Sequence, residues 1–162
     1  MRVPLYRVED NESRARFRQG RGIRAEGYKK WVHYNPLTRR QRESLKGELW
    51  AHLDWRNRSP TPFISTSRDR DWVFDEASRR KQEGKTNVRV YKIKVPDDLE
   101  RYSRSRNCRV VFKKLTKWLG RAHSTLPCYA PDNCSWNEYL FLHDIPSDLI
   151  KDITDEWRRE ML

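Results

Sequence analysis

Three kinds of side chain in this sequence could act on a charged substrate: a guanidinium, a run of hydroxyls and a carboxylate. The guanidinium belongs to Arg7, which lies among apolar residues in a short segment rich in strand formers. A charge in such a place is costly unless it meets an opposite charge. Because its planar fork suits phosphate or carboxylate in bidentate geometry, the sequence predicts an anion contact for Arg7.

The hydroxyl run is Ser-Thr-Ser at residues 65–67, and the carboxylate is Glu138, which opens the apolar run Glu-Tyr-Leu-Phe-Leu-His. Side chains alternate between the two faces of a strand, so we expect Ser65 and Ser67 to point one way and Thr66 the other. A carboxylate buried without a partner is costly. We therefore expect Glu138 to face a cleft or to be paired.

Each of these groups also has a purely structural interpretation. Arg7 could form a buried ion pair with Glu9 or Glu138, and Glu138 could instead cap a turn. The hydroxyl run could belong to an ordinary edge strand. The four histidines form no recognisable Ser-His-Asp or Cys-His-Asn motif.

Hydrophobic periodicity indicates the elements that would position these groups. Apolar alternation and turn residues predict strands at residues 3–8, 63–67, 88–95, 109–113 and 138–143. Helical spacing predicts helices at residues 38–56 and 70–82, a short basic helix after Pro96, and a closing helix with Leu149, Ile153, Trp157 and Met161 on one face. Asp69 is the expected N-cap of the second helix, and residues 11–30 are expected to form a loop with at most a short helix.

The order of these elements is not a regular alternation of strand and helix. It predicts an α+β fold with a mixed or antiparallel sheet, in one domain over residues 1–162. The first residues contain no apolar signal segment, and no apolar run reaches the ~20 residues of a membrane helix. We expect an intracellular protein, in the cytoplasm or the nucleus, without a membrane partner.

The composition is strongly basic and rich in aromatic residues. The net charge is +12, and 12% of the residues are Phe, Trp or Tyr, which can build a core in an otherwise polar chain. Such a charge attracts polyanions, so nucleic acid or an acidic protein is an expected partner. Candidate phosphate contacts lie at residues 14–24, 39–42 and 101–117, with Trp31, Tyr34 and Trp118 as candidate stacking rings.

The three cysteines are too few for a disulfide framework. Cys128 and Cys134 could close a small loop, but free thiols are the expectation for a reducing compartment. A zinc site from these two with His123 and His143 would lack any Cys-x-x-Cys pair, so we expect no metal.

Taken in order, the motifs resemble the Arg-Ser-Glu signature of the mono-ADP-ribosyltransferases. The arginine in Leu-Tyr-Arg opens the pattern, the block Pro-Phe-Ile-Ser-Thr-Ser follows, and Glu138 starts a late strand that runs into Asp-Ile-Pro. The opening LYRVEDNESR and the PFISTS block also resemble a fungal domain family.

This resemblance implies a split sheet around a cleft for NAD, which would be the substrate. The chain would transfer ADP-ribose to a macromolecular acceptor, or to water as an NAD glycohydrolase. Arg7 would hold the phosphates or the adenosine ribose, and Ser65 would support the nicotinamide ribose and orient the glutamate. Glu138 would accept a hydrogen bond from the ribose 2′-hydroxyl and stabilise the oxocarbenium-like transition state.

The resemblance also implies supporting residues. Tyr6, Thr66 and Ser67 would belong to the cofactor side of the cleft. Phe74 or Trp72 would stack on the nicotinamide, although both could simply pack the second helix on the sheet.

The acceptor loop of the family falls at about residues 124–137 of this chain, with Tyr129 and Trp136 as candidate contacts. Members that modify arginine carry Glu or Gln two residues before the catalytic glutamate. This chain has Trp136 there, so we do not expect an arginine acceptor.

A second function is open on the same residues. The chain could be a catalytically inactive domain of this fold that binds nucleic acid or an acidic protein through its basic surface. An enzyme requires Arg7, Ser65 and Glu138 at one cleft, whereas a binding module requires only a continuous basic surface.

Overall fold

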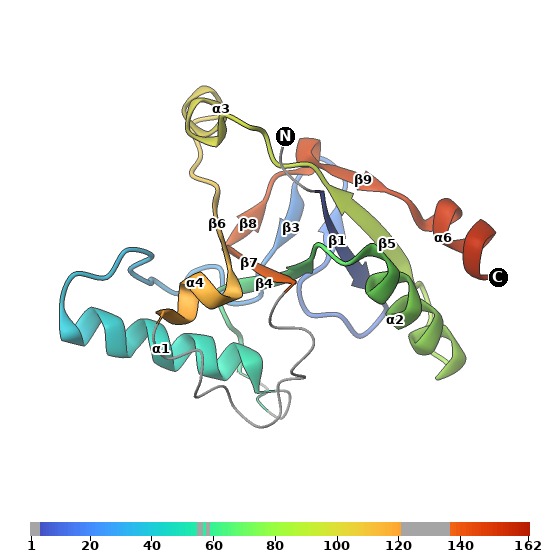
Figure 1. Ribbon diagram of the computed structural model, residues 1–162, viewed down its shortest axis with the longest axis horizontal. Helices are drawn as coiled ribbons and strands as arrows, with labels where there is room; N and C mark the ends of the chain where they lie inside the picture. The colour runs from blue at the N-terminus through green and yellow to red at the C-terminus, as the bar shows by residue number, and fades with distance from the viewer. Residues whose placement is uncertain (1–3, 55–56, 58, 121–136) are drawn as a thin grey trace.

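A computed structural model describes residues 4–54, 57, 59–120 and 137–162 of the chain. Over these residues the chain forms a six-stranded sheet, a three-stranded sheet and flanking helices, and all strand pairs are antiparallel (Figure 1). The predicted α+β class is confirmed.

The six-stranded sheet has the order β6-β7-β4-β1-β5-β9. Its strands, in chain order, are β1 (Leu5–Glu9), β4 (Phe63–Ser67), β5 (Arg89–Ile93), β6 (Val111–Lys114), β7 (Glu138–Leu142) and β9 (Ile150–Asp152). The smaller sheet has the order β2-β3-β8 and consists of β2 (Phe17–Arg18), β3 (Gly22–Arg24) and β8 (Asp144–Ile145). The helices are α1 (Arg39–Leu53), α2 (Arg70–Gln82), α3 (Leu99–Ser105), α4 (Leu115–Leu119), the 3₁₀ turn η2 (Ser147–Leu149) and α6 (Thr154–Met161).

The two long helices begin at capping residues that the sequence supplies. Thr38 and Gln41 form a reciprocal capping box at the start of α1. The carboxylate of Asp69 accepts a hydrogen bond of 3.0 Å from the backbone N–H of Trp72 at the start of α2, as expected.

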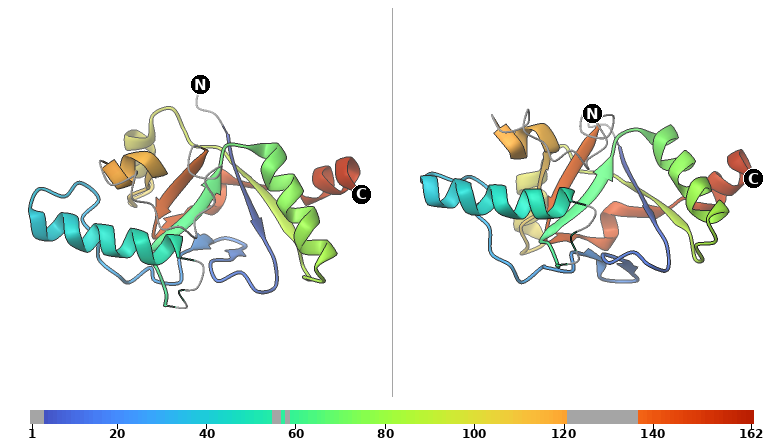
Figure 2. Two further views of the ribbon diagram at one scale, coloured as in Figure 1. Left: turned by 60° about the horizontal axis from the view of Figure 1, so that its bottom comes forward. Right: turned by 90° about the horizontal axis from the view of Figure 1, so that it is seen from below.

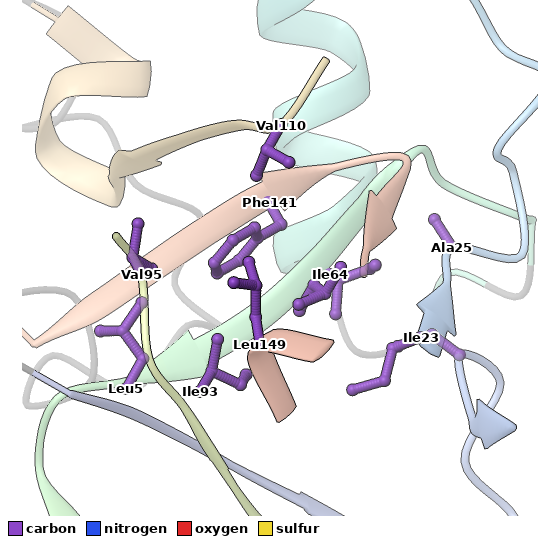
Figure 3. Packing of buried hydrophobic residues seen from close by; sticks show 11 residues of the cluster. Leu5, Ile23, Ala25, Ile64, Ile93, Val95, Val110, Phe141 and Leu149 are labelled. Atoms are coloured by element: carbon purple, nitrogen blue, oxygen red, sulfur yellow. The ribbon is translucent and has the colours of Figure 1, made fainter. Parts of the chain in front are cut away.

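Both long helices cover the same face of the six-stranded sheet, and the small sheet covers the other. On the helix face, α1 and α4 pack on β4 and β7 around Phe63 and Leu140, while α2 and α6 pack on β1 and β5 around Val90 and Trp157. On the opposite face, Ile64 and Phe141 pack against residues of the small sheet such as Ile23 (Figure 3).

The large sheet is split between β1 and β4. β1 pairs with β5 at all five of its residues, and β4 pairs with β7 at all five of its own. Between β1 and β4 the register contains one pair, Tyr6 opposite Ser67. Beyond this pair the two strands diverge, with α1 beside one and α2 beside the other (Figure 2).

Two sequence predictions were wrong. Residues 11–30 were expected to lack strands, but they contain the β2–β3 hairpin. Gly22 lets the hairpin pack against β8, because its φ is +93° and a Cβ at this position would lie 2.0 Å from the carbonyl oxygen of Ile145. The closing helix begins at Thr154, and Leu149 lies in η2. Leu149 packs in the core between the sheets, whereas Ile153 and Trp157 pack with α2.

In the part of the chain that the structure describes, helices long and apolar enough to cross a membrane are absent.

Candidate functional site

The guanidinium of Arg7 bridges the two strands where they diverge. Its Nη1 donates a hydrogen bond of 2.9 Å to the main-chain carbonyl of Ser65 on β4. Its Nη2 donates one of 2.7 Å to the carbonyl of Ala15, and its Nε lies 3.3 Å from a carboxylate oxygen of Glu9. The side chain therefore replaces main-chain pairing that the split removes from β4.

Glu9 is the anion that Arg7 meets among its apolar neighbours, and this ion pair is one of the two that the purely structural interpretation of Arg7 allowed. Burial lowers the pKa of Arg7, and the charge of Glu9 opposes that shift. The carboxylate of Glu9 also accepts a hydrogen bond of 3.0 Å from the backbone N–H of Phe17. The pair thus attaches the start of the β2–β3 hairpin to β1.

The hydroxyl of Ser65 contacts His52, a histidine that belongs to no recognisable catalytic motif. Nε2 of His52, in the last turn of α1, lies 2.8 Å from the Ser65 Oγ. Nδ1 of the same ring lies 2.6 Å from the Oγ1 of Thr61. Burial, together with the nearby charge of Arg7, lowers the pKa of His52 to about 4. The imidazole is therefore neutral near pH 7, with one nitrogen as donor and the other as acceptor.

The carboxyl group of Glu138 bonds with the same hydroxyl. Ser67 is the register partner of Glu138, so Ser65 and Glu138 are diagonal neighbours on the helix face of the sheet. Burial raises the pKa of Glu138 to about 7, and its hydrogen bond with Ser65 works against that rise. Near neutral pH this carboxyl group is thus poised between its two charge states.

Thr61, His52, Ser65 and Glu138 consequently form one hydrogen-bonded row. When Glu138 is ionised, the Ser65 hydroxyl donates to it and accepts from Nε2–H of His52, and the Thr61 hydroxyl donates to Nδ1. When Glu138 is protonated, it can donate to Ser65 and every bond of the row can reverse. The tautomer of His52 is thereby coupled to the charge of Glu138.

A cavity of about 460 Å³ lies beside this row, between the C-terminal ends of α1 and α2. Arg7, His52, Thr61 and Ser65 line it. Glu138 is not among the described lining residues, although it bonds with the lining residue Ser65; this differs from the expectation that both face the same cleft directly.

The lining is balanced in charge although the chain as a whole is strongly basic. Among the described lining residues, five cations are matched by five acids: Arg7, Arg14, Arg79, Arg80 and Lys85 against Asp10, Glu12, Glu26, Asp54 and Glu83. A cavity of this kind favours a ligand of small net charge over a polyanion.

Four of the residues expected on the cofactor side are not among the described lining residues of the cavity: Tyr6, Thr66, Ser67 and Phe74. Tyr6 and Phe74 are buried in the core between α2 and the sheet, and neither lines the cavity. The guanidinium carbon of Arg70 lies 4.1 Å from the centre of the Phe74 ring and covers it. Phe74 therefore packs α2 on the sheet, which was the structural alternative to stacking on the nicotinamide. Trp72 on α2 is 37% exposed.

The remaining hydroxyls of the run serve the backbone. Thr66 points away from Ser65, as expected, and its Oγ1 donates a hydrogen bond of 2.9 Å to the carbonyl of Tyr139. The Oγ of Ser67 accepts one of 3.0 Å from the N–H of Asp69, where the chain turns into α2. Of the three hydroxyls, only that of Ser65 belongs to the hydrogen-bonded row.

Several predicted residues cannot be placed in the site. The acceptor-loop candidates Tyr129 and Trp136 lie outside the described residues, as do His123, Cys128 and Cys134. One feature of the sequence could have pointed to His52. It is a polar residue directly before Leu53, the last of the buried leucines of α1, so it lies near the buried side of the helix end.

The profile of one protein family, described as a domain of unknown function (DUF7587), matches residues 1–155 of the chain. A search of curated proteins gives no match.

Proposed function

The chain belongs to the DUF7587 family, and we propose that it is an NAD-dependent ADP-ribosyltransferase or NAD glycohydrolase. Nicotinamide would leave from NAD, and ADP-ribose would pass to a macromolecular acceptor or to water.

The observation that carries this proposal is that Arg7 and Glu138 both bond with Ser65, so that the three expected residues meet at one place. The Ser65 carbonyl accepts from Arg7, and the Ser65 hydroxyl bonds with Glu138. The three residues come from strands β1, β4 and β7, and they were singled out from the sequence as an ordered signature. Their meeting at a split in the sheet, beside a cavity, supports a common site.

The cavity suits this substrate in size and charge. Its volume falls in the range of roughly 300–1,000 Å³ typical of small-molecule sites. NAD joins two anionic phosphates to one cationic ring, so its small net charge fits a balanced lining. Arg7 uses three of its five N–H groups within the protein, which leaves two for a phosphate or a ribose.

Glu138 would act as a carboxylate. As the bond to nicotinamide breaks, positive charge builds on the ribose, and a nearby anion stabilises that transition state more than the ground state. The ribose hydroxyl would join Ser65 as a donor to Glu138, since an ionised carboxylate has several acceptor positions. With water as acceptor the products are ADP-ribose, nicotinamide and one proton.

The alternative is a catalytically inactive domain used as a basic binding module. It is favoured by the fact that Arg7, Ser65 and Glu138 all have protein partners, so the three could simply hold the split sheet together.

NAD labelled separately in its nicotinamide and adenine parts distinguishes these functions. The proposal predicts free nicotinamide, with the adenine label either in free ADP-ribose or on an acceptor. If NAD stays intact with every acceptor fraction, including nucleic acid and acidic proteins, the enzymatic function is rejected in favour of the binding module.

A further inference from the structure

The positive charge of the chain is concentrated in two segments outside the cavity. Residues 28–46 and 109–117 together carry ten Lys and Arg residues and a single acid, Glu43. They therefore account for nine of the twelve net charges of the chain. We refer to these two segments as the basic–aromatic surface.

The two segments lie side by side in the fold. Lys113 Nζ donates a hydrogen bond to the carbonyl of Tyr34 and lies 3.1 Å from the Oδ1 of Asn35. The guanidinium carbon of Arg109 lies 4.9 Å from the centre of the Tyr34 ring. Helix α4 lies beside α1, and the loop of residues 28–37 leads into α1 from its outer end (Figure 1). The cations thus share one region of the molecule.

These cations differ from those of the cavity in having few acidic partners. Each of the five cavity cations makes an ion pair with an Asp or Glu side chain. Of the ten cations of the basic–aromatic surface, only Lys30 does so within the described residues, with Glu48 at 3.7 Å. The positive potential of this surface is therefore left uncompensated, which attracts an anionic partner.

Aromatic rings are exposed among these charges. Trp31 is 73% exposed and Tyr28 is 37% exposed. The ring of His33 meets Trp31 edge-on at 5.7 Å, which leaves much of the indole open to solvent. Trp118, expected from the sequence to be a stacking ring, is instead buried in the core beneath α1.

We propose that the basic–aromatic surface binds single-stranded nucleic acid, with its cations along the backbone and Trp31 stacked on a base. Exposed rings among cations that mostly lack acidic partners are what surfaces that bind single strands use, and stacking on Trp31 requires an unpaired base. The thirteen-residue step from Arg39 to His52 along α1 corresponds to roughly 20 Å, so this surface is separate from the cavity. Binding here does not depend on NAD cleavage.

Fluorescence anisotropy with labelled twenty-nucleotide oligo(dT) and oligo(U), and with a duplex of equal length, tests the proposal. The double substitution Arg39→Glu/Arg40→Glu should weaken single-strand binding about tenfold or more and flatten its salt dependence by roughly 1.4 in log–log slope. Arg158→Glu/Arg159→Glu on α6 changes the net charge equally and should have little effect. Trp31→Ala should weaken binding roughly ten- to a hundredfold, whereas Trp72→Ala should not.

Several outcomes would overturn the proposal. They are undetectable binding at 50 mM salt, tighter binding of the duplex, and equal losses in the α6 control. Circular dichroism checks that these surface variants are folded. Stronger binding to phosphatidylserine vesicles or to polyglutamate, lost in the Arg39/Arg40 variant, would replace nucleic acid by a membrane surface or an acidic protein.

Discussion

The Oγ of Ser65 lies 2.8 Å from Nε2 of His52 and also bonds with Glu138, so the serine of the expected signature is held by a second partner besides its carboxylate. This makes His52 a positioning residue for the proposed reaction. Its neutral ring accepts or donates at Nε2 according to the charge of Glu138.

Two substitutions of His52 separate its two contacts. The amide of Gln reaches about as far as Nε2, so His52→Gln should keep the contact with Ser65 and lose that with Thr61. His52→Asn reaches only as far as Nδ1 and should do the reverse. We expect His52→Asn to reduce nicotinamide release more than His52→Gln does, while both lose about 1–3 kcal/mol in urea unfolding. Equal activity in the two variants would show that the Ser65 contact does not matter for the reaction.

The stability of the chain should depend on pH through Glu138 and His52 in opposite senses. The folded pKa of Glu138 is raised from 4.5 to about 7, so its contribution to stability is complete below pH 4.5 and is lost as pH rises through 7. The folded pKa of His52 is lowered from 6.5 to about 4, so its contribution is complete above pH 6.5 and is lost as pH falls through 4. Between about pH 4.5 and 6.5 the fall in stability due to Glu138 and the rise due to His52 nearly cancel, so the stability of the wild type changes little with pH.

The contributions of Glu138 and His52 are separated by measuring the unfolding free energy of each variant minus that of the wild type as a function of pH. The difference for Glu138→Gln should rise with pH between 4.5 and 7, and that for His52→Gln should fall between pH 4 and 6.5. Each change amounts to roughly 3 kcal/mol at most. Flat curves for both variants would mean that neither group is buried in the manner described.

Arg7→Lys keeps the charge but removes the planar fork. A lysine cannot reach the carbonyls of Ser65 and Ala15 together, so one of these acceptors is left without its donor. We expect a loss of about 1–3 kcal/mol in unfolding free energy and roughly ten- to a hundredfold weaker NAD binding by calorimetry. Arg16→Lys, at an exposed position, serves as the control. Unchanged NAD affinity in the Arg7 variant would restrict Arg7 to a structural role.

Two glycines give an opposed pair of predictions. A Cβ on Gly27 would lie 2.7 Å from the carbonyl carbon of Thr61, so Gly27→Ala should displace Thr61 from His52 and destabilise the fold. Gly47 lies in α1 with open space around its Cβ position, and Gly47→Ala should stabilise the helix by about 1 kcal/mol. Thermal melts compare the two, and a stabilised Gly27 variant would contradict the close packing described.

The sequence predicted those parts of the fold that local patterns specify. The strand at residues 63–67 and the helix at 70–82 matched, because Pro62 and the cap Asp69 define their ends. The β2–β3 hairpin was not predicted, since its strands of two and three residues are too short to show an alternating pattern and β3 depends on β8 for pairing. Likewise, Ile150–Asp152 forms an edge strand only because β5 is there to pair with it.

The site was predictable in its residue types but not in its connections. Arg7, Ser65 and Glu138 could be recognised in the sequence because each is a polar residue in or beside an apolar strand segment. The contact of His52 with Ser65 depends on how the end of α1 packs on β4, and the bond from Arg7 to the Ser65 carbonyl depends on the split between β1 and β4. Tertiary geometry of this kind leaves no periodic signal in the sequence.

Nicotinamide release from NAD, compared between the wild type and Glu138→Gln at pH 8, where Glu138 is mostly ionised, shows whether this carboxylate drives the reaction. Chromatography measures release, and calorimetry measures NAD affinity in the same preparations. We expect release by the wild type, and in the variant a similar NAD affinity with release slowed on the order of a hundredfold or more. Equal release by the two proteins, or no NAD binding by the wild type, would contradict it.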